Sequence, residues 1–317
     1  MLEVSNADRV VFPDIAKTKG DVVAYYDRIA ERALPHVLGR PLSIMRYPKG
    51  LSERGFFQKN VPPHYPKSIA RFGRARSASA SKKHKDPKNR ERDETLYPVL
   101  SAPEHLPYLA NQGAIELHIP TARVSAIDLP DRFIVDLDPP PGATALVQRA
   151  ALLVRAALSE FGLPCLPMAT GSKGYHLVAP ITPSVDSDQL ALTAFKLATL
   201  LSARHPDELT ITYRVALRGQ RVFLDWLRNN TNASAIAPFS LRANARARVA
   251  TPLAWDELAS TPPDAFGISD IDKLLDRLDP LFELMKAPAD PQPFVDQVFE
   301  AFERSGLVLE PFDRFRS

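Results

Sequence analysis

Apolar residues recur at the spacing of an α-helix in five segments of the chain. In the first segment they fall three and four positions apart between Val22 and Leu34, and Gly39 and Pro41 follow it. The second segment begins at Thr144, which we take as its N-cap, and ends before Gly162. The pattern predicts helices over residues 18–38, 144–161, 187–204, 269–285 and 293–305.

Shorter runs are continuously apolar or alternate apolar and polar residues, as β-strands do. They predict strands over residues 41–46, 55–59, 115–119, 132–138, 166–169, 175–179, 209–215 and 222–227. Helices and strands do not alternate strictly, so we predict an α+β fold rather than a doubly wound parallel sheet. We interpret residues 1–317 as one compact domain, with an N-terminal part (1–110), a core (111–260) and a helical C-terminal part (261–317).

The distribution of charge singles out one segment. The formal net charge is only +3, but residues 67–92 hold ten Lys or Arg against Asp86 and Glu91, a local net charge of +8. Residues 71–92 show little apolar periodicity, so we predict a mobile loop there. Charge of a single sign is typical of a surface that binds a polyanion, and the candidate DNA contacts are Lys82, Lys83 and Lys85.

Composition excludes several classes of protein. The single cysteine, Cys165, rules out a disulfide within the chain and a cysteine-cluster zinc site. The N-terminus lacks the apolar run of a signal peptide, and no stretch approaches roughly 18 uninterrupted apolar residues. A hydrophobic fraction of 45% supplies a core. We therefore expect a cytoplasmic protein with no membrane partner.

Two aspartates end the apolar strand predicted over 132–138. Side chains two positions apart on a strand share a face, so Asp136 and Asp138 project together while Leu137 faces the core. Adjacent carboxylates repel unless a cation or a proton lies between them, and such oxygen pairs hold Mg²⁺ or Mn²⁺ against phosphates. Asp225 stands in a similar run, so the three indicate metal-assisted phosphoryl chemistry. A polar strand end that meets solvent is the plainer alternative for the pair.

The turn over residues 170–176 is a second candidate. Its glycines let backbone N–H groups approach an anion, while Thr170, Lys173 and His176 supply donors and charge. The spacing of a Walker A phosphate loop is absent. A plain β-hairpin with a glycine turn is an equally good interpretation.

Arginine and aromatic residues give weaker signals. Arg228 and Arg242 flank a polar loop and carry the planar fork that binds phosphate, although a single arginine is usually solvated. His118 has apolar neighbours, where a core histidine is the more common case. On a strand, one of Phe56 and Phe57 would enter the core and the other would face out, where it can stack on a nucleobase. A bulge that buries both rings is the alternative.

Together these segments resemble the polymerase domain of bacterial non-homologous end-joining DNA ligase D, a branch of the archaeo-eukaryotic primase superfamily that includes free-standing relatives. The resemblance runs through residues 5–13, 18–26, 39–43, 55–60, 116–118, 133–139, 170–176, 222–229, 239–242 and 251–258. It implies a primase-type catalytic core of antiparallel sheets flanked by helices. The chain departs from the family at Thr170, where serine is common, and after His118, where Ile-Pro-Thr follows. The basic segment over 71–92 also looks enlarged.

The resemblance implies roles residue by residue. Asp136, Asp138 and Asp225 would hold two Mn²⁺ or Mg²⁺ ions about 3.5–4 Å apart. Phe56 and Phe57 would meet the template. Residues that would hold the nucleotide and its triphosphate are His118, Thr170, Lys173, His176, Arg228 and Arg242, with Arg46 and Lys59 as further basic contacts. Residues that would hold the 5′-phosphate of a downstream strand are Arg9 and Lys19.

The implied reaction is template-directed nucleotidyl transfer from NTPs or dNTPs at DNA gaps or ends. Ku and a DNA ligase are the implied partners, and the nucleoid is the implied location. Three alternatives stay open. The first is a non-catalytic module that binds and bridges DNA ends. The second is a short-gap repair polymerase that acts outside end joining. The third is an Asp-x-Asp metal phosphatase, although that pattern continues with Thr or Val where this chain has Pro140.

Overall fold

The larger of two main sheets carries the aspartates singled out above. The computed structural model describes residues 2–75 and 94–309, so the candidates Lys82, Lys83 and Lys85 lie outside the described residues. The strand order of this sheet is β11 (Leu209–Thr210), β12 (Val222–Asp225), β8 (Arg132–Asp138), β10 (Tyr175–Pro180), β9 (Leu166–Ala169) and β14 (Thr251–Pro252). Neighbouring strands run antiparallel, except that β11 and β12 are parallel.

A second, antiparallel sheet lies beside the first. Its strand order is β13 (Ala235–Ile236), β7 (Ala114–Ile119), β3 (Ser43–Arg46) and β4 (Phe56–Gln58), so β4 is an edge strand. Two further ribbons pair β1 (Val10–Phe12) with β2 (Lys17–Thr18) and β5 (Ala70–Ala75) with β6 (Glu94–Val99). The mixed helices and antiparallel sheets confirm the predicted α+β class.

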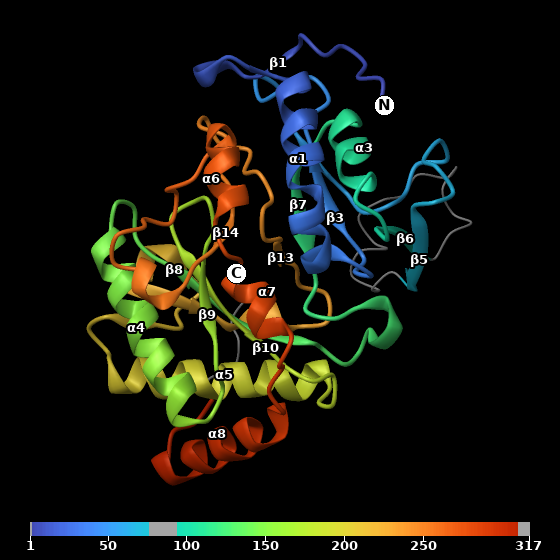
Figure 1. The fold of residues 1–317 in the computed structure, drawn as a ribbon. Coiled ribbons are helices and arrows are strands. Elements are labelled where there is room, and N and C mark those ends of the chain that lie inside the picture. Colours follow the sequence, from blue (N-terminus) through green and yellow to red (C-terminus); the bar gives the residue numbers. More distant parts are fainter. Residues whose placement is uncertain (1, 76–93, 310–317) are drawn as a thin grey trace.

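Helices cover the two sheets separately (Figure 1). The longer helices are α1 (Lys19–Val37), α3 (His105–Asn111), α4 (Thr144–Glu160), α5 (Ser187–Arg204) and α8 (Pro291–Ser305), with α6 (Ile271–Asp276) and α7 (Pro280–Met285) between α5 and α8. Short 3₁₀ helices cover Pro13–Ile15, Val124–Ala126, Val215–Leu217, Trp226–Asn229, Trp255–Glu257 and Ile268–Asp270. None of the helices that the structure describes combines the length and apolarity needed to cross a bilayer.

Two buried apolar clusters form the core. One packs α4, α5 and α8 against the larger sheet through residues such as Leu137, Val154 and Phe294. The other packs α1 and α3 against the smaller sheet, and its Tyr25 and Tyr26 hydroxyls donate to the carbonyls of Phe239 and Ile115. These buried hydrogen bonds tie the N-terminal helix to segments far along the chain, because an unpaired buried hydroxyl would be costly.

Most predicted elements are present, and several boundaries were wrong. The prediction over 18–38 is confirmed: Thr18 caps α1 by accepting from the backbone of Asp21, whose carboxylate accepts from the backbone of Thr18. The prediction that Thr144 caps α4 was wrong, since Ala143 occupies the N-cap without a side-chain bond. The predicted helix 269–285 is broken before Pro280, because a residue that precedes proline disfavours helical backbone.

The strand predictions need three corrections. The strand predicted over 209–215 ends at Thr210, and the Arg218 side chain takes the carbonyls of Thr212 and Tyr213 that a longer strand would have used. The strand predicted over 222–227 ends at Asp225, where a 3₁₀ turn begins. Residues 71–75, predicted as loop, belong to β5 and pair with β6.

Candidate active site

The two aspartates of β8 occupy one face of the larger sheet. Leu137 between them is fully buried, whereas Asp136 and Asp138 keep 13% and 30% of their side-chain surface exposed. Strand β12 runs antiparallel to β8 and sets Asp225 directly opposite Asp136. The three carboxylates therefore meet at one place, as the strand pattern predicted. Asp136 and Asp138 line a cavity of about 190 Å³, and Asp225 lies beside it.

Every one of these carboxylates has a basic partner. The Arg228 Nε donates to Asp136 at 2.9 Å, and its Nη2 lies 3.5 Å from Asp225. The His176 Nε2 lies 3.5 Å from Asp136 on the other side. Asp138 is bound by the Lys173 Nζ at 2.7 Å and by the Arg218 Nη1 at 2.8 Å. Positive and negative groups thus alternate along the cavity.

The pKa values of the neighbouring carboxyls move apart. Burial opposes ionisation of Asp136, but His176 and Arg228 outweigh it and hold its pKa well below the ordinary range. Burial and then repulsion from Asp136 raise the pKa of Asp225. Two carboxylates close enough to repel are a pair that an added cation would stabilise.

The smaller sheet supplies the opposite wall of the cavity. Glu116 of β7 is buried, and its carboxylate lies 2.9 Å from the His118 Nε2 and 3.4 Å from the Arg242 Nε. The backbone N–H of Ala243 also donates to Glu116. Although burial opposes it, hydrogen bonding to His118 and the charge of Arg242 lower the pKa of Glu116. Glu116 therefore fixes both side chains at the cavity edge.

The turn between β9 and β10 is shaped by close backbone packing. A Cβ at Gly174 would stand 2.0 Å from the Leu137 carbonyl oxygen, and Gly171 has φ +68° with the Arg242 side chain 2.7 Å from its would-be Cβ. The Thr170 hydroxyl donates to the Gly174 carbonyl at 2.7 Å, which closes the hairpin. The glycines let the hairpin lie against β8, and Lys173 is left more than half exposed at the cavity.

Two basic candidates stand outside this cavity. The Arg46 Nε donates to the Gln112 carbonyl at 2.8 Å, and its guanidinium lies 5.6 Å from the centre of the Phe56 ring. Lys59 lines a smaller neighbouring cavity that shares only Ser234 with the lining of the first.

Arg9 and Lys19 lie together at the start of the chain. The Lys19 Nζ donates to the Ser5 carbonyl at 2.6 Å, and Arg9 donates to the Pro48 carbonyl. Burial and then the charge of Arg9 lower the pKa of Lys19. Two cations this close would be stabilised by an anion.

Phe56 and Phe57 are both exposed, at 48% and 57%. The prediction that one ring enters the core was wrong, and so was the alternative that both are buried, because β4 is the edge strand of its sheet. The Phe57 ring meets the His118 ring edge-on with centroids 5.3 Å apart, so it extends the cavity wall outward.

Three residues at the site were not among the candidates. Arg218 binds Asp138 from a loop, and no pattern in the sequence distinguishes Arg218 as a site residue. Asn229 is buried and bonds the backbone N–H and carbonyl of Ile134, which fixes the 3₁₀ turn carrying Arg228 to β8. Glu116 could have been found from the sequence, because it is a charged residue at an inward-facing position of a strand.

A divalent ion is implied by this donor chemistry. Carboxylate oxygens are the ligands that Mg²⁺ and Mn²⁺ prefer, and the Asp136–Asp225 repulsion marks a place where a cation is favourable. Across residues 2–75 and 94–309, no group of three or more His, Cys, Asp and Glu side chains is arranged to hold a metal ion. The basic partners occupy the carboxylate oxygens, so an ion would have to replace them there.

Known proteins share this fold and sequence. Residues 18–282 match the family described as LigD, primase-polymerase domain. The multifunctional non-homologous end joining protein LigD of Mycolicibacterium smegmatis is 34% identical over 91% of this chain and 36% of its own length. The bifunctional LigD of Bacillus subtilis is 28% identical over 91% of this chain and 45% of its own length. The polymerase domain of Mycobacterium tuberculosis ligase D, solved in complex with DNA, has a TM-score of 0.81 and 30% identity, covering 91% of this chain and 99% of that one.

These matches define a primase-polymerase, which is by class a DNA-directed nucleotidyltransferase. The chain belongs to the LigD primase-polymerase domain family. It spans 36% of the M. smegmatis protein and 45% of the B. subtilis protein, so the resemblance concerns one part of those relatives.

Proposed function

We propose that this protein is a DNA-repair polymerase that fills gaps or extends ends by template-directed nucleotidyl transfer. The observation that carries the proposal is the convergence of Asp136, Asp138 and Asp225 from adjacent strands beside a cavity rimmed by cations. Family membership and the DNA-bound relative support the same class of reaction. The end-joining relatives give the repair setting.

The three aspartates would hold two Mn²⁺ or Mg²⁺ ions. Bound there, such ions activate the primer 3′-OH and neutralise charge on the triphosphate and the leaving pyrophosphate. The carboxylates now share their charge with Arg228, Lys173 and Arg218. If metal ions bound there, they would replace these basic partners, and the released side chains would be free to bind phosphate oxygens.

The nucleotide would lie between the two sheets. Lys173, His176 and Arg228 stand on the larger-sheet side of the cavity, while His118 and Arg242 stand on the other. Phosphoryl transfer depends mainly on positioning and on offsetting charge, which is what five basic side chains around one cavity supply. We propose that both NTPs and dNTPs are accepted, since the described cavity wall offers polar groups to a sugar from Ser172 and Ser234.

DNA would approach along the smaller sheet. The exposed Phe57 ring next to His118 offers a stacking surface for a template base. Arg9 and Lys19 form a cationic pair suited to a 5′-phosphate. Binding through such phosphate contacts falls steeply with salt. Ku and a DNA ligase are the partners that an end-joining role would bring.

The test is incorporation of labelled NTPs and dNTPs into a gapped, 5′-phosphorylated duplex with Mn²⁺. We expect extension by the wild type, and a loss of about 100-fold or more in Asp136→Ala with an unchanged circular dichroism spectrum. Asp296→Ala, which removes an exposed aspartate on α8, is the matched control.

The same assay separates the alternatives. Near-normal extension by Asp136→Ala would reject the proposed site. DNA binding by the wild type without incorporation would instead indicate an end-bridging module, and phosphate release without DNA a phosphatase. Comparison of gapped with open-ended duplexes distinguishes short-gap repair from end joining.

A further inference from the structure

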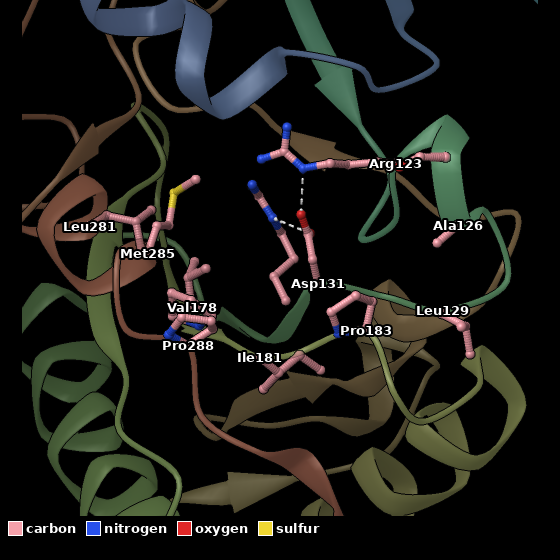
Figure 2. A pocket seen from close by; sticks show the side chains of 13 residues that line it. Arg123, Ala126, Leu129, Asp131, Val178, Ile181, Pro183, Leu281, Met285 and Pro288 are labelled. Atoms are coloured by element: carbon pink, nitrogen blue, oxygen red, sulfur yellow. Dashed lines mark hydrogen bonds and ion pairs between the residues drawn. The ribbon is translucent and has the colours of Figure 1, made fainter.

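A second cavity lies at the opposite ends of the strands that carry the candidate active site. It has a volume of about 250 Å³ and lies between α7, the end of β10 and the segment that leads into β8 (Figure 2). Arg132 begins β8 and pairs with Pro180 at the end of β10, whereas Asp136 pairs with His176. The two cavities share no lining residue.

One wall of this second cavity carries more positive than negative charge. Asp131 lies between Arg123, whose Nε donates to it at 2.7 Å, and Arg132, whose Nε is 3.6 Å away. Behind them the fully buried Arg40 binds both oxygens of Asp131, at 2.5 and 2.6 Å. Three guanidinium groups thus share one carboxylate. The nearby Asp279 is already bound to His36 at 2.7 Å.

Two of these arginines keep donors for a ligand. Arg40 uses all three of its nitrogens, on Asp131 and on the carbonyls of His36 and Pro120. Within residues 2–75 and 94–309, Nη2 of Arg123 and Nη1 of Arg132 have no hydrogen-bond acceptor. The Arg132 side chain is only 5% exposed and lines the cavity. Neither of these nitrogens is among the fully buried unpaired atoms of the described residues, so both remain accessible to an anion in the cavity, and a guanidinium donates strongly to an anion.

The rest of the cavity is apolar. Figure 2 shows Leu281 and Met285 of α7 on one side, Ile181 at the floor, and Pro183 with Leu129 on the far side. A cavity of about 150 Å³ already holds a benzene molecule, so this one has room for a ring or a branched chain with a charged group. Apolar walls with a few convergent polar groups are typical of small-molecule sites.

We propose that this cavity binds a small amphipathic carboxylate, with its charged group on the two arginines and its apolar body in the space beyond. A carboxylate matches the planar fork of a guanidinium, and its negative charge offsets part of the excess on this wall. Because the cavity begins at the first residue of β8, a bound ligand would contact the strand that carries Asp136 four positions on.

The test is calorimetric titration of the full chain, without DNA or metal, using benzoate, benzamide and inorganic phosphate. We expect saturable binding of benzoate, and binding about tenfold or more weaker for benzamide, which has the same shape without the charge. Phosphate should also bind more weakly because it leaves the apolar walls uncovered. Equal binding of benzoate and benzamide, or of benzoate and phosphate, would overturn the proposal.

Two variants test the site by different routes. Arg123→Gln removes one free donor, and Met285→Trp fills the apolar end, so each should weaken benzoate about tenfold or more, while Arg204→Gln on α5 should not. Unchanged benzoate affinity in either folded pocket variant contradicts the proposal. Asp136→Ala should bind benzoate like the wild type, which keeps this result independent of the proposed polymerase activity.

Discussion

The two ends of strand β8 carry the same kinds of charged side chain, but they differ in how far the ion pairs are exposed. At its start, Asp131 is shared by three arginines, of which Arg40 has no exposed surface. At its end, Asp136 and Asp138 are bound by cations that reach them from a hairpin and from loops, and Lys173 is 53% exposed. The Arg40–Asp131 pair at the start is locked into the core, whereas the pairs at the end can exchange partners.

This difference separates a structural ion pair from a site that does chemistry. A buried pair whose remaining donors are all bonded holds segments together, because opening it strands charge away from water. A partly exposed pair loses little when it opens, so its members remain available for a substrate. The second end of β8 is therefore the one suited to bind phosphates and metal ions.

Arg40→Met should produce the largest change in stability. It removes the buried guanidinium that binds both Asp131 oxygens and two backbone carbonyls, so we expect the free energy of unfolding to fall by about 3–5 kcal/mol. Urea denaturation of the variant and the wild type measures this loss. A change below about 1 kcal/mol would mean that the buried end of β8 is no more stabilising than a surface pair.

The pH dependence of stability provides the next largest effect. Burial opposes ionisation of Asp131, but Arg40 and Arg132 lower its pKa to about 2 from the ordinary 3.8. Because the folded-state pKa is the lower one, the stabilisation is complete above the unfolded value and is lost as pH falls through about 2. It amounts to about 2–3 kcal/mol.

Asp131→Asn isolates this contribution. The wild type should lose about 2 kcal/mol more than the variant between pH 4.5 and pH 2, as measured by urea denaturation. Other carboxyls with lowered pKa values, including Glu116 and Asp279, contribute equally to both proteins. If the two curves of stability against pH run parallel, the arginines do not lower the pKa of Asp131.

Phe57→Ala tests whether strand β4 forms part of the surface that binds DNA. The Phe57 ring lies next to His118 at the catalytic end, whereas Phe282, on α7, lies near the other end and is also partly exposed. Removing Phe57 should weaken binding of DNA with a single-stranded template by about 1–3 kcal/mol per stacked base. Fluorescence anisotropy measures the affinity, and Phe282→Ala should leave it unchanged. Equal effects of the two substitutions would argue against a template surface on β4.

Lys173→Met should have the smallest effect on stability. Because its pair with Asp138 is exposed, the free energy of unfolding should change by less than about 1 kcal/mol. Nucleotide affinity should fall, since the side chain would no longer meet the triphosphate. Titration with a fluorescent nucleotide and urea denaturation of the same sample separate the two effects. A large loss of stability with normal nucleotide binding would mean that the Lys173–Asp138 pair is structural and does not bind the nucleotide.

The sequence predicted what depends on short-range periodicity. The alternation in β8 was enough to bring Asp136 and Asp138 to one face and Leu137 to the core. The segment 170–174 was recognisable as a turn, but its glycines are required by the Leu137 carbonyl and by the Arg242 side chain, which are distant in sequence. Local pattern therefore located the turn without giving its physical reason.

Short-range periodicity could not predict contacts between charged residues that lie far apart in the sequence. Arg40 and Asp131 are separated by 91 positions, and Arg218 and Asp138 by 80. No pattern in the sequence links the two members of either pair, and only the fold brings them together. The burial of β4 was misjudged for a related reason, since period-two alternation does not reveal that a strand lies at the edge of a sheet.

The most direct test is whether the three converging carboxylates bind a divalent cation. Electron paramagnetic resonance during a Mn²⁺ titration, with nucleotide present, compares the wild type with Asp225→Asn, which keeps the size of the side chain and removes its charge. We predict saturable binding by the wild type and binding at least about tenfold weaker by the variant, because ligand charge sets the affinity of such sites. Equal Mn²⁺ binding by the two proteins would contradict the account.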